Sequence, residues 1–148
     1  GVFDAIIIDF PDPSNFALGK LYSVPMYRLV MKHLSENGLM VVQSTSPLHA
    51  PYSYWCINAT LQSVGLYTHP YHAFVPSFGE WGFILASKKT GYTPPRSYRV
   101  PMKFLDAETT RQMFFFPPDM QPVKVEVNQL NNQSLVNYFE QDWAKVIR

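Results

Sequence analysis

Short apolar runs without polar alternation recur along the first ninety residues. Residues 5–8 and 39–42 form two such runs, and a polar or proline-rich stretch follows each of them. A β-branched run of this kind is typical of a strand buried on both faces of a parallel sheet. The pattern therefore predicts two parallel strands near the start of the chain.

Helical periodicity separates and follows these strands. A first helix is expected to begin at a Ser23 cap and to end at Gly38, where a positive φ suits glycine. Its apolar face includes His33, which we expect to be packed in the core. A second helix is expected over 51–64, closed by Gly65.

Two further strands are expected over 66–75 and 81–87. The five residues between them are too few for a helical crossover, so these strands must pair antiparallel. The predicted order is β-α-β-α-β-β, an α/β fold that ends in an antiparallel hairpin.

The rest of the chain differs in character, which predicts a division at residue 90. Residues 91–101 read as a proline-rich, irregular connection, and a short helix is expected over 106–116. Asn131 or Asn132 could cap a final amphipathic helix. The apolar stripe of that helix comprises Leu135, Val136, Phe139, Trp143 and Val146. We therefore divide the chain into 1–90, an α/β unit, and 91–148, a helical extension.

Composition narrows the possible partners. The 148 residues carry 12 Lys and Arg against 11 Asp and Glu, a net charge of +1, which argues against a nucleic-acid surface or a polybasic membrane patch. Aromatic residues make up 16%, which excludes a disordered chain. No apolar run approaches the roughly 18 residues of a membrane span. The single cysteine, Cys56, excludes an internal disulfide and is expected to be a buried thiol in a reducing compartment.

Polar clusters follow three of the predicted strands, where ligands bind in open parallel sheets. They are Asp9 with Asp12, residues 43–46 and residues 77–80. Two neighbouring carboxylates predict a cationic ligand, a metal or a shared proton. The alternative is that Asp12 only opens a turn and Asp9 only caps a loop.

Four short motifs resemble the spermidine synthase (polyamine aminopropyltransferase) family, in that family's order and over roughly residues 3–88. They are Asp9-Phe10-Pro11-Asp12-Pro13, Leu21-Tyr22-Ser23, residues 38–43 and residues 75–83. Residues 116–120 and 128–133 resemble the long bacterial members that carry an N-terminal membrane domain.

The resemblance implies the C-terminal half of a Rossmann-like sheet of the class I methyltransferase type. It implies that Asp9 is catalytic, that Asp12 grips the diamine, and that Gln43 lies near the substrate. Phe78 stands where the family usually has a substrate-binding tyrosine, which leaves the identity of the diamine open. Glu80 replaces a common glutamine and would add negative charge near a cationic ligand.

The chemistry of an alkylamine suits these residue types. Its pKa near 10.4 keeps it protonated at neutral pH, so a carboxylate must remove a proton before the nitrogen can attack. Tyr22, Phe78 and Trp81 are expected to pack on the methylene chain and to offer cation–π contacts.

The resemblance also implies a co-substrate, decarboxylated S-adenosylmethionine, with no prosthetic group. Its binding residues are expected upstream of Gly1, because the chain has seven glycines and no G-x-G-x-x-G turn. We therefore expect this piece to be inactive alone. Its first strand is expected to be a free sheet edge that could pair with a second copy. The parent protein is expected in the bacterial inner membrane, with this chain on the cytoplasmic side.

The leading hypothesis is aminopropyl transfer to a polyamine such as putrescine. The alternatives are an S-adenosylmethionine-dependent methyltransferase and a non-catalytic relative that binds a polyamine or a partner protein. We expect no metal site, since His69 and His72 make a poor pair of ligands on one strand.

Overall fold

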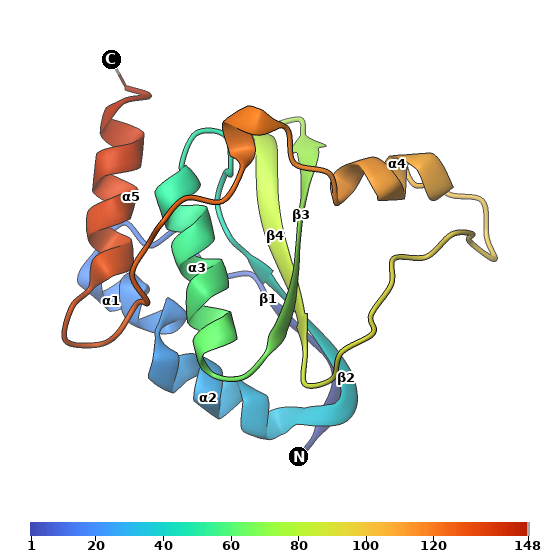
Figure 1. Cartoon of the computed structure of the whole chain (residues 1–148), viewed down its shortest axis with the longest axis horizontal. Helices are drawn as coiled ribbons and strands as arrows, with labels where there is room; N and C mark the ends of the chain where they lie inside the picture. Colours follow the sequence, from blue (N-terminus) through green and yellow to red (C-terminus); the bar gives the residue numbers. More distant parts are fainter. Residues whose placement is uncertain (148) are drawn as a thin grey trace.

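The computed structural model describes residues 1–147 (Figure 1). The strands are β1 Phe3–Ile8, β2 Leu34–Gln43, β3 Tyr67–Val75 and β4 Gly79–Ser87. The α-helices are α1 Phe16–Gly19, α2 Val24–His33, α3 Pro51–Ser63, α4 Ala107–Met113 and α5 Ser134–Ala144, with 3₁₀ turns η1 Lys20–Tyr22 and η2 Pro118–Met120.

The four strands form one sheet in the order β1-β2-β4-β3. β1 and β2 are parallel, with Ile8 opposite Val42. β4 is antiparallel to both of its neighbours, so the expected hairpin of β3 and β4 is confirmed. The hairpin folds back so that its second strand, β4, lies between β2 and β3.

One face of the sheet carries the core. Met40, Val42 and Ile84 project from this face and are fully buried. Residues of α3 such as Ile57 and Leu61 belong to the same hydrophobic cluster. Figure 1 shows α2, α3 and α5 on this side of the sheet and α4 beyond β3. The last helix contributes Leu135 to the same core, so the extension packs on the α/β unit.

A glycine allows α3 to approach the sheet closely. A Cβ atom at Gly82 would lie 2.4 Å from Cε2 of Tyr54 and 2.7 Å from the carbonyl oxygen of Thr45. The Tyr54 hydroxyl lies 3.2 Å from the carbonyl oxygen of Tyr71 and 3.0 Å from that of Phe83. The buried phenol therefore joins the helix to the hairpin.

Two local predictions for the first helix were wrong. α2 ends at His33, and Gly38 lies inside β2 without a positive φ. His33 is exposed rather than packed in the core. The helix does begin after Ser23 at the N-cap, as expected, but the Ser23 hydroxyl donates to the carbonyl oxygen of Lys20 and makes no capping hydrogen bond. Pairing with β1, which begins opposite Leu34, draws this segment into the sheet and shortens the helix.

The prediction that the first strand is buried on both faces was also wrong for the described residues. Ile8 is 5% exposed on the core face, whereas Ile7 on the opposite face is 79% exposed. β1 does lie at a sheet edge, as expected. Its pairing with a second copy stays a prediction.

The extension follows the expected outline. Residues 91–101 contain no helix or strand, and α4 is shorter than the predicted helix. The N-cap of α5 is Gln133, with φ of 49°, rather than an asparagine. Asn132 nevertheless accepts from the backbone N–H of Ser134 through its side chain at 3.2 Å. Within residues 1–147, no helix is long and apolar enough to cross a membrane.

Candidate active site

A cavity of about 780 Å³ opens beside the carboxyl ends of β1 and β2. Its lining combines acidic, amide and aromatic side chains from segments that are far apart in the sequence. These are Asp9, Phe10, Pro11, Asp12, Gln43, Ser77, Phe78, Trp81, Phe139 and Trp143. The ends of two parallel strands have thus brought the first two predicted polar clusters together, as expected.

The two carboxylates both reach this cavity. Asp9 is exposed and follows β1 directly, whereas Asp12 is half-buried. Burial raises the pKa of Asp12, and a hydrogen bond from Gln43 partly offsets this effect. In residues 1–147 no ion pair involves either carboxylate. Among the described residues, the site therefore presents negative charge that no cationic side chain pairs with.

Gln43 holds the loop that follows β1, residues 9–12 (the acidic loop), against the end of β2. Its Nε2 donates to Asp12 Oδ1 and to the carbonyl oxygen of Phe10, both at 3.1 Å. Its Oε1 accepts from the backbone N–H of Thr45 at 2.5 Å. Thr45 has a positive φ of 60°, which non-glycine residues seldom adopt. The amide therefore has every polar atom engaged and fixes the orientation of Asp12.

The structure does not place Tyr22 in the cavity wall. Its ring is fully buried, and its hydroxyl lies 3.0 Å from the carbonyl oxygens of both Phe10 and Pro11. Burial, with the charges of Asp12 and Asp9, raises the pKa of this phenol. The Tyr22 ring packs in the core, and only its hydroxyl reaches the acidic loop. Tyr22 therefore supports the acidic loop from its buried side.

Aromatic side chains form the apolar part of the wall. Phe78 is 62% exposed, and its ring centroid lies 5.1 Å from that of Trp81. Both face the cavity, as expected. Phe139 and Trp143 of α5 line it too, although the sequence pattern placed them only on the apolar stripe of that helix. Their helical spacing indicated an apolar face but not which surface that face covers.

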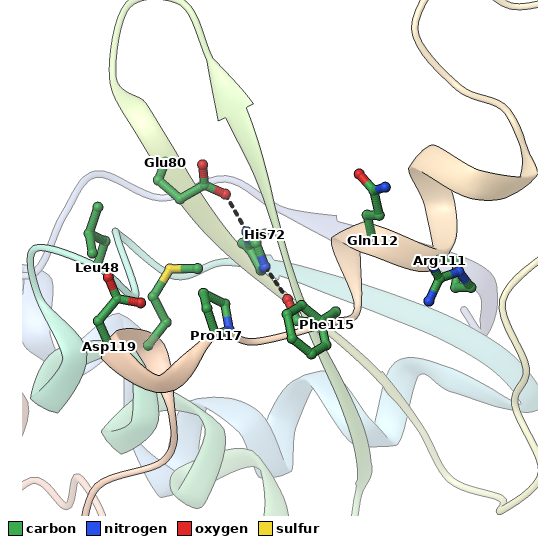
Figure 2. Close-up of a pocket in the computed structure, with 9 residues that line it drawn as sticks. Leu48, His72, Glu80, Arg111, Gln112, Phe115, Pro117 and Asp119 are labelled. Atoms are coloured by element: carbon green, nitrogen blue, oxygen red, sulfur yellow. Dashed lines mark hydrogen bonds and ion pairs between the residues drawn. The ribbon is translucent and has the colours of Figure 1, made fainter.

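Glu80 lies outside this cavity, contrary to the expectation. It lines a second cavity, of about 650 Å³, where its Oε1 contacts Nδ1 of His72 (Figure 2). The other ring nitrogen of His72 lies 2.6 Å from the carbonyl oxygen of Phe115. Both partners offer oxygen atoms, so the two ring nitrogens hold His72 between Glu80 and the carbonyl of Phe115. Alternation along β4 explains the error, since Glu80 and Trp81 point to opposite faces of the sheet.

His69 and Cys56, two further residues that could carry chemistry, pack against neighbouring residues in the structure. His69 packs against Tyr92, with ring centroids 4.9 Å apart. Over residues 1–147, no three His, Cys, Asp or Glu side chains group as metal ligands would. Cys56 is buried as expected, and burial raises the pKa of its thiol to about 12.

The chain matches the model of a known protein family. The model of the spermine/spermidine synthase domain matches residues 2–96. The remaining residues, 97–148, lie outside that match.

Curated relatives match nearly the whole chain. Polyamine aminopropyltransferase 2 of Ralstonia nicotianae is 62% identical over 148 residues, which cover 99% of this chain and 29% of that protein. The polyamine aminopropyltransferase of Leptospira interrogans is 44% identical over 146 residues, with the same coverage of 99% and 29%. The chain thus spans less than a third of the length of these relatives.

Two solved structures share the fold. Spermidine synthase from Thermotoga maritima superposes with a TM-score of 0.65 at 23% identity, over 78% of this chain and 41% of that one. A spermidine synthase in complex with the transition-state analogue AdoDATO gives a TM-score of 0.66 at 25% identity, over 78% and 42%. The predicted methyltransferase-type α/β fold is therefore confirmed.

Proposed function

Because this chain belongs to the spermine/spermidine synthase domain family, we propose that the full-length protein transfers an aminopropyl group from decarboxylated S-adenosylmethionine to a polyamine such as putrescine. One observation carries the proposal: Asp9 and Asp12 line a single cavity and no protein cation is paired with either in the described chain. Unbalanced carboxylates in a half-buried cavity favour a cationic ligand.

The acceptor must lose a proton before it reacts. An alkylammonium with a pKa near 10.4 needs about 4–5 kcal/mol to expose its lone pair at pH 7. We assign this proton to Asp9, whose side chain is exposed and makes no hydrogen bond within the described chain that would occupy its oxygens. A carboxylate next to the nitrogen lowers the barrier by accepting the proton and by orienting the lone pair.

The step balances without a further reagent. The nitrogen lone pair forms a bond to the methylene carbon next to the sulfonium. The carbon–sulfur bond breaks, and its electron pair leaves with sulfur, which becomes a neutral thioether. The proton from nitrogen goes to Asp9.

The remaining residues hold the acceptor in place. We assign Asp12 to an ammonium group of the acceptor, since Gln43 fixes its orientation at 3.1 Å. Attraction between unit charges 4 Å apart is about 4 kcal/mol at an effective dielectric constant of 20, before desolvation is subtracted. Phe78 and Trp81 supply apolar surface for the methylene chain. The division into 1–90 and 91–148, and donor binding by other parts of the protein, remain part of this proposal.

Assays of the full-length protein test the proposal directly. Incubation with putrescine and decarboxylated S-adenosylmethionine is expected to give a product lengthened by one aminopropyl unit, detected by mass spectrometry. Methylated product from S-adenosylmethionine would favour a methyltransferase instead, and saturable polyamine binding without turnover a non-catalytic relative. Residues 1–148 alone are expected to give no turnover.

A further inference from the structure

Helix α5 contributes two aromatic side chains to the cavity of the proposed active site. Phe139 and Trp143 are four residues apart, so they lie on one face of the helix. Their ring centroids are 5.9 Å apart, and both line the cavity that contains Asp9 and Asp12. The family match ends at residue 96, so this wall comes from outside the matched domain.

A buried carboxylate fixes the C-terminal part of α5. Asp142 is 2% exposed, and its Oδ2 accepts from the backbone N–H of Ser53 at 2.9 Å and from the Ser53 hydroxyl at 2.8 Å. The N-cap of α3, Ala50, provides no side-chain cap. Asp142 therefore caps α3 from another helix, where negative charge is favourable. The residue next to it, Trp143, is thereby held at the cavity.

A second anchor joins the start of α5 to the segment beneath the acidic loop. Asn128 is buried, and its Nδ2 donates to the carbonyl oxygens of Gly19 at 3.0 Å and Tyr22 at 3.2 Å. Its Oδ1 accepts from the backbone N–H of Leu135 at 3.2 Å. Since Tyr22 supports the loop of Asp9 and Asp12, helix and loop share one rigid support.

We propose that Phe139 and Trp143 contact the hydrocarbon segment of the acceptor amine and set which chain length the enzyme prefers. This inference rests on the proposed aminopropyl transfer. The two carboxylates recognise charge, which every diamine carries, so they discriminate chain length poorly. An aromatic wall excludes water from a fixed length of methylene chain, and one methylene in such a pocket changes specificity by about 10- to 200-fold.

The test compares variants of the full-length protein. Trp143→Ala and Phe139→Ala remove the wall, whereas Tyr138→Ala removes an aromatic ring from the same helix outside the cavity. Tyr138 stacks on Tyr52, with ring centroids 5.8 Å apart. The steady-state kcat and KM are measured for diamines of three, four and five carbons, together with the KM for the sulfonium donor.

The wall variants are expected to raise the KM for the preferred diamine about tenfold and to flatten or reorder the preference among diamines. Tyr138→Ala and the donor KM are expected to change less than about twofold. An equal loss for every diamine, or an equal effect of Tyr138→Ala, would overturn the inference. Trp143→Phe keeps an aromatic ring at this position, so it controls for the possibility that Trp143→Ala does not fold. It is expected to shift the preference towards longer diamines. An unchanged preference would count against a role of the aromatic wall in chain-length selection.

Failure of the proposed function can be distinguished from failure of this inference. If the wild-type protein transfers no aminopropyl group, the proposed function is wrong. The affinities of the three diamines are then measured by calorimetry instead. Weaker and less selective binding by Trp143→Ala than by Tyr138→Ala would still support the wall. Equal binding by the two variants would overturn it.

Discussion

Two cavities of similar size, about 780 and 650 Å³, lie at the same end of the sheet and use neighbouring residues of β4. Each combines carboxylates with aromatic rings. In the first, Asp9 and Asp12 have no cationic partner within the described chain. In the second, Glu80 contacts His72, whose ring is fixed by a carbonyl oxygen on its other side.

Both cavities contain acidic residues, so their presence alone does not identify a binding site. What separates the two cavities is whether the carboxylates already contact a basic side chain. A carboxylate whose oxygen already contacts a histidine ring is less available to a ligand ammonium. A carboxylate held by an amide keeps its charge available, and Gln43 is uncharged. Under the proposed function, amine binding therefore belongs to the first cavity, and Glu80 has a mainly structural role.

Removal of the Asp9 charge is expected to have the largest effect. Asp9→Asn in the full-length protein should lower kcat for aminopropyl transfer by about 10²- to 10⁴-fold, because the amide cannot accept the proton. Product formation under saturating substrates measures the loss, and the melting temperature verifies that the fold is intact. Wild-type rates in this variant would show that Asp9 does not accept the proton from the amine.

Asp12→Asn is expected to act mainly on binding. The KM for the diamine should rise about 10- to 100-fold, the usual range for a lost hydrogen bond between charged groups, with a smaller change in kcat. The donor KM serves as the internal control. A loss confined to kcat would mean that the roles of the two carboxylates are not divided as proposed.

The raised pKa of Asp12 predicts a pH dependence of the same binding step. The diamine stays protonated in acid, so affinity depends on ionised Asp12 and should fall as pH falls through that pKa, at a midpoint above 3.8. Calorimetric titration of Asp9→Asn isolates this group, and the Asp9→Asn/Asp12→Asn double variant should show a flatter profile. A midpoint below 3.8 would contradict the effect of burial.

The smallest effect is expected for a substitution in the second cavity. Glu80→Gln should change the diamine KM and kcat less than about twofold, while removal of the charged partner of His72 lowers the free energy of unfolding by about 1 kcal/mol. Denaturant titration measures the stability of the variant. A rise in diamine KM comparable with that of Asp12→Asn would erase the distinction between the cavities.

Several elements could be predicted because their signals are local. The hairpin of β3 and β4 follows from a connection too short for a crossover, and Gly65 ends α3 with φ of 94°. One cavity is lined by Asp9, Asp12 and Gln43 because the ends of parallel strands converge. The helix expected up to Gly38 failed because strand pairing with β1 outweighs a local helical pattern.

By itself, the sequence determined the α/β order, the antiparallel hairpin and the acidic pair after the first strand, since periodicity and short spacing act within a few residues of the chain. Only the tertiary structure decided which carboxylates remain unpaired and which apolar stripe lines the cavity. Asp142 reaches Ser53 across 89 positions of the chain, and Glu80 meets His72 across the hairpin. Contacts of that kind depend on how elements pack, so the contact of Glu80 with His72 and the aromatic wall from α5 emerge only in the folded protein.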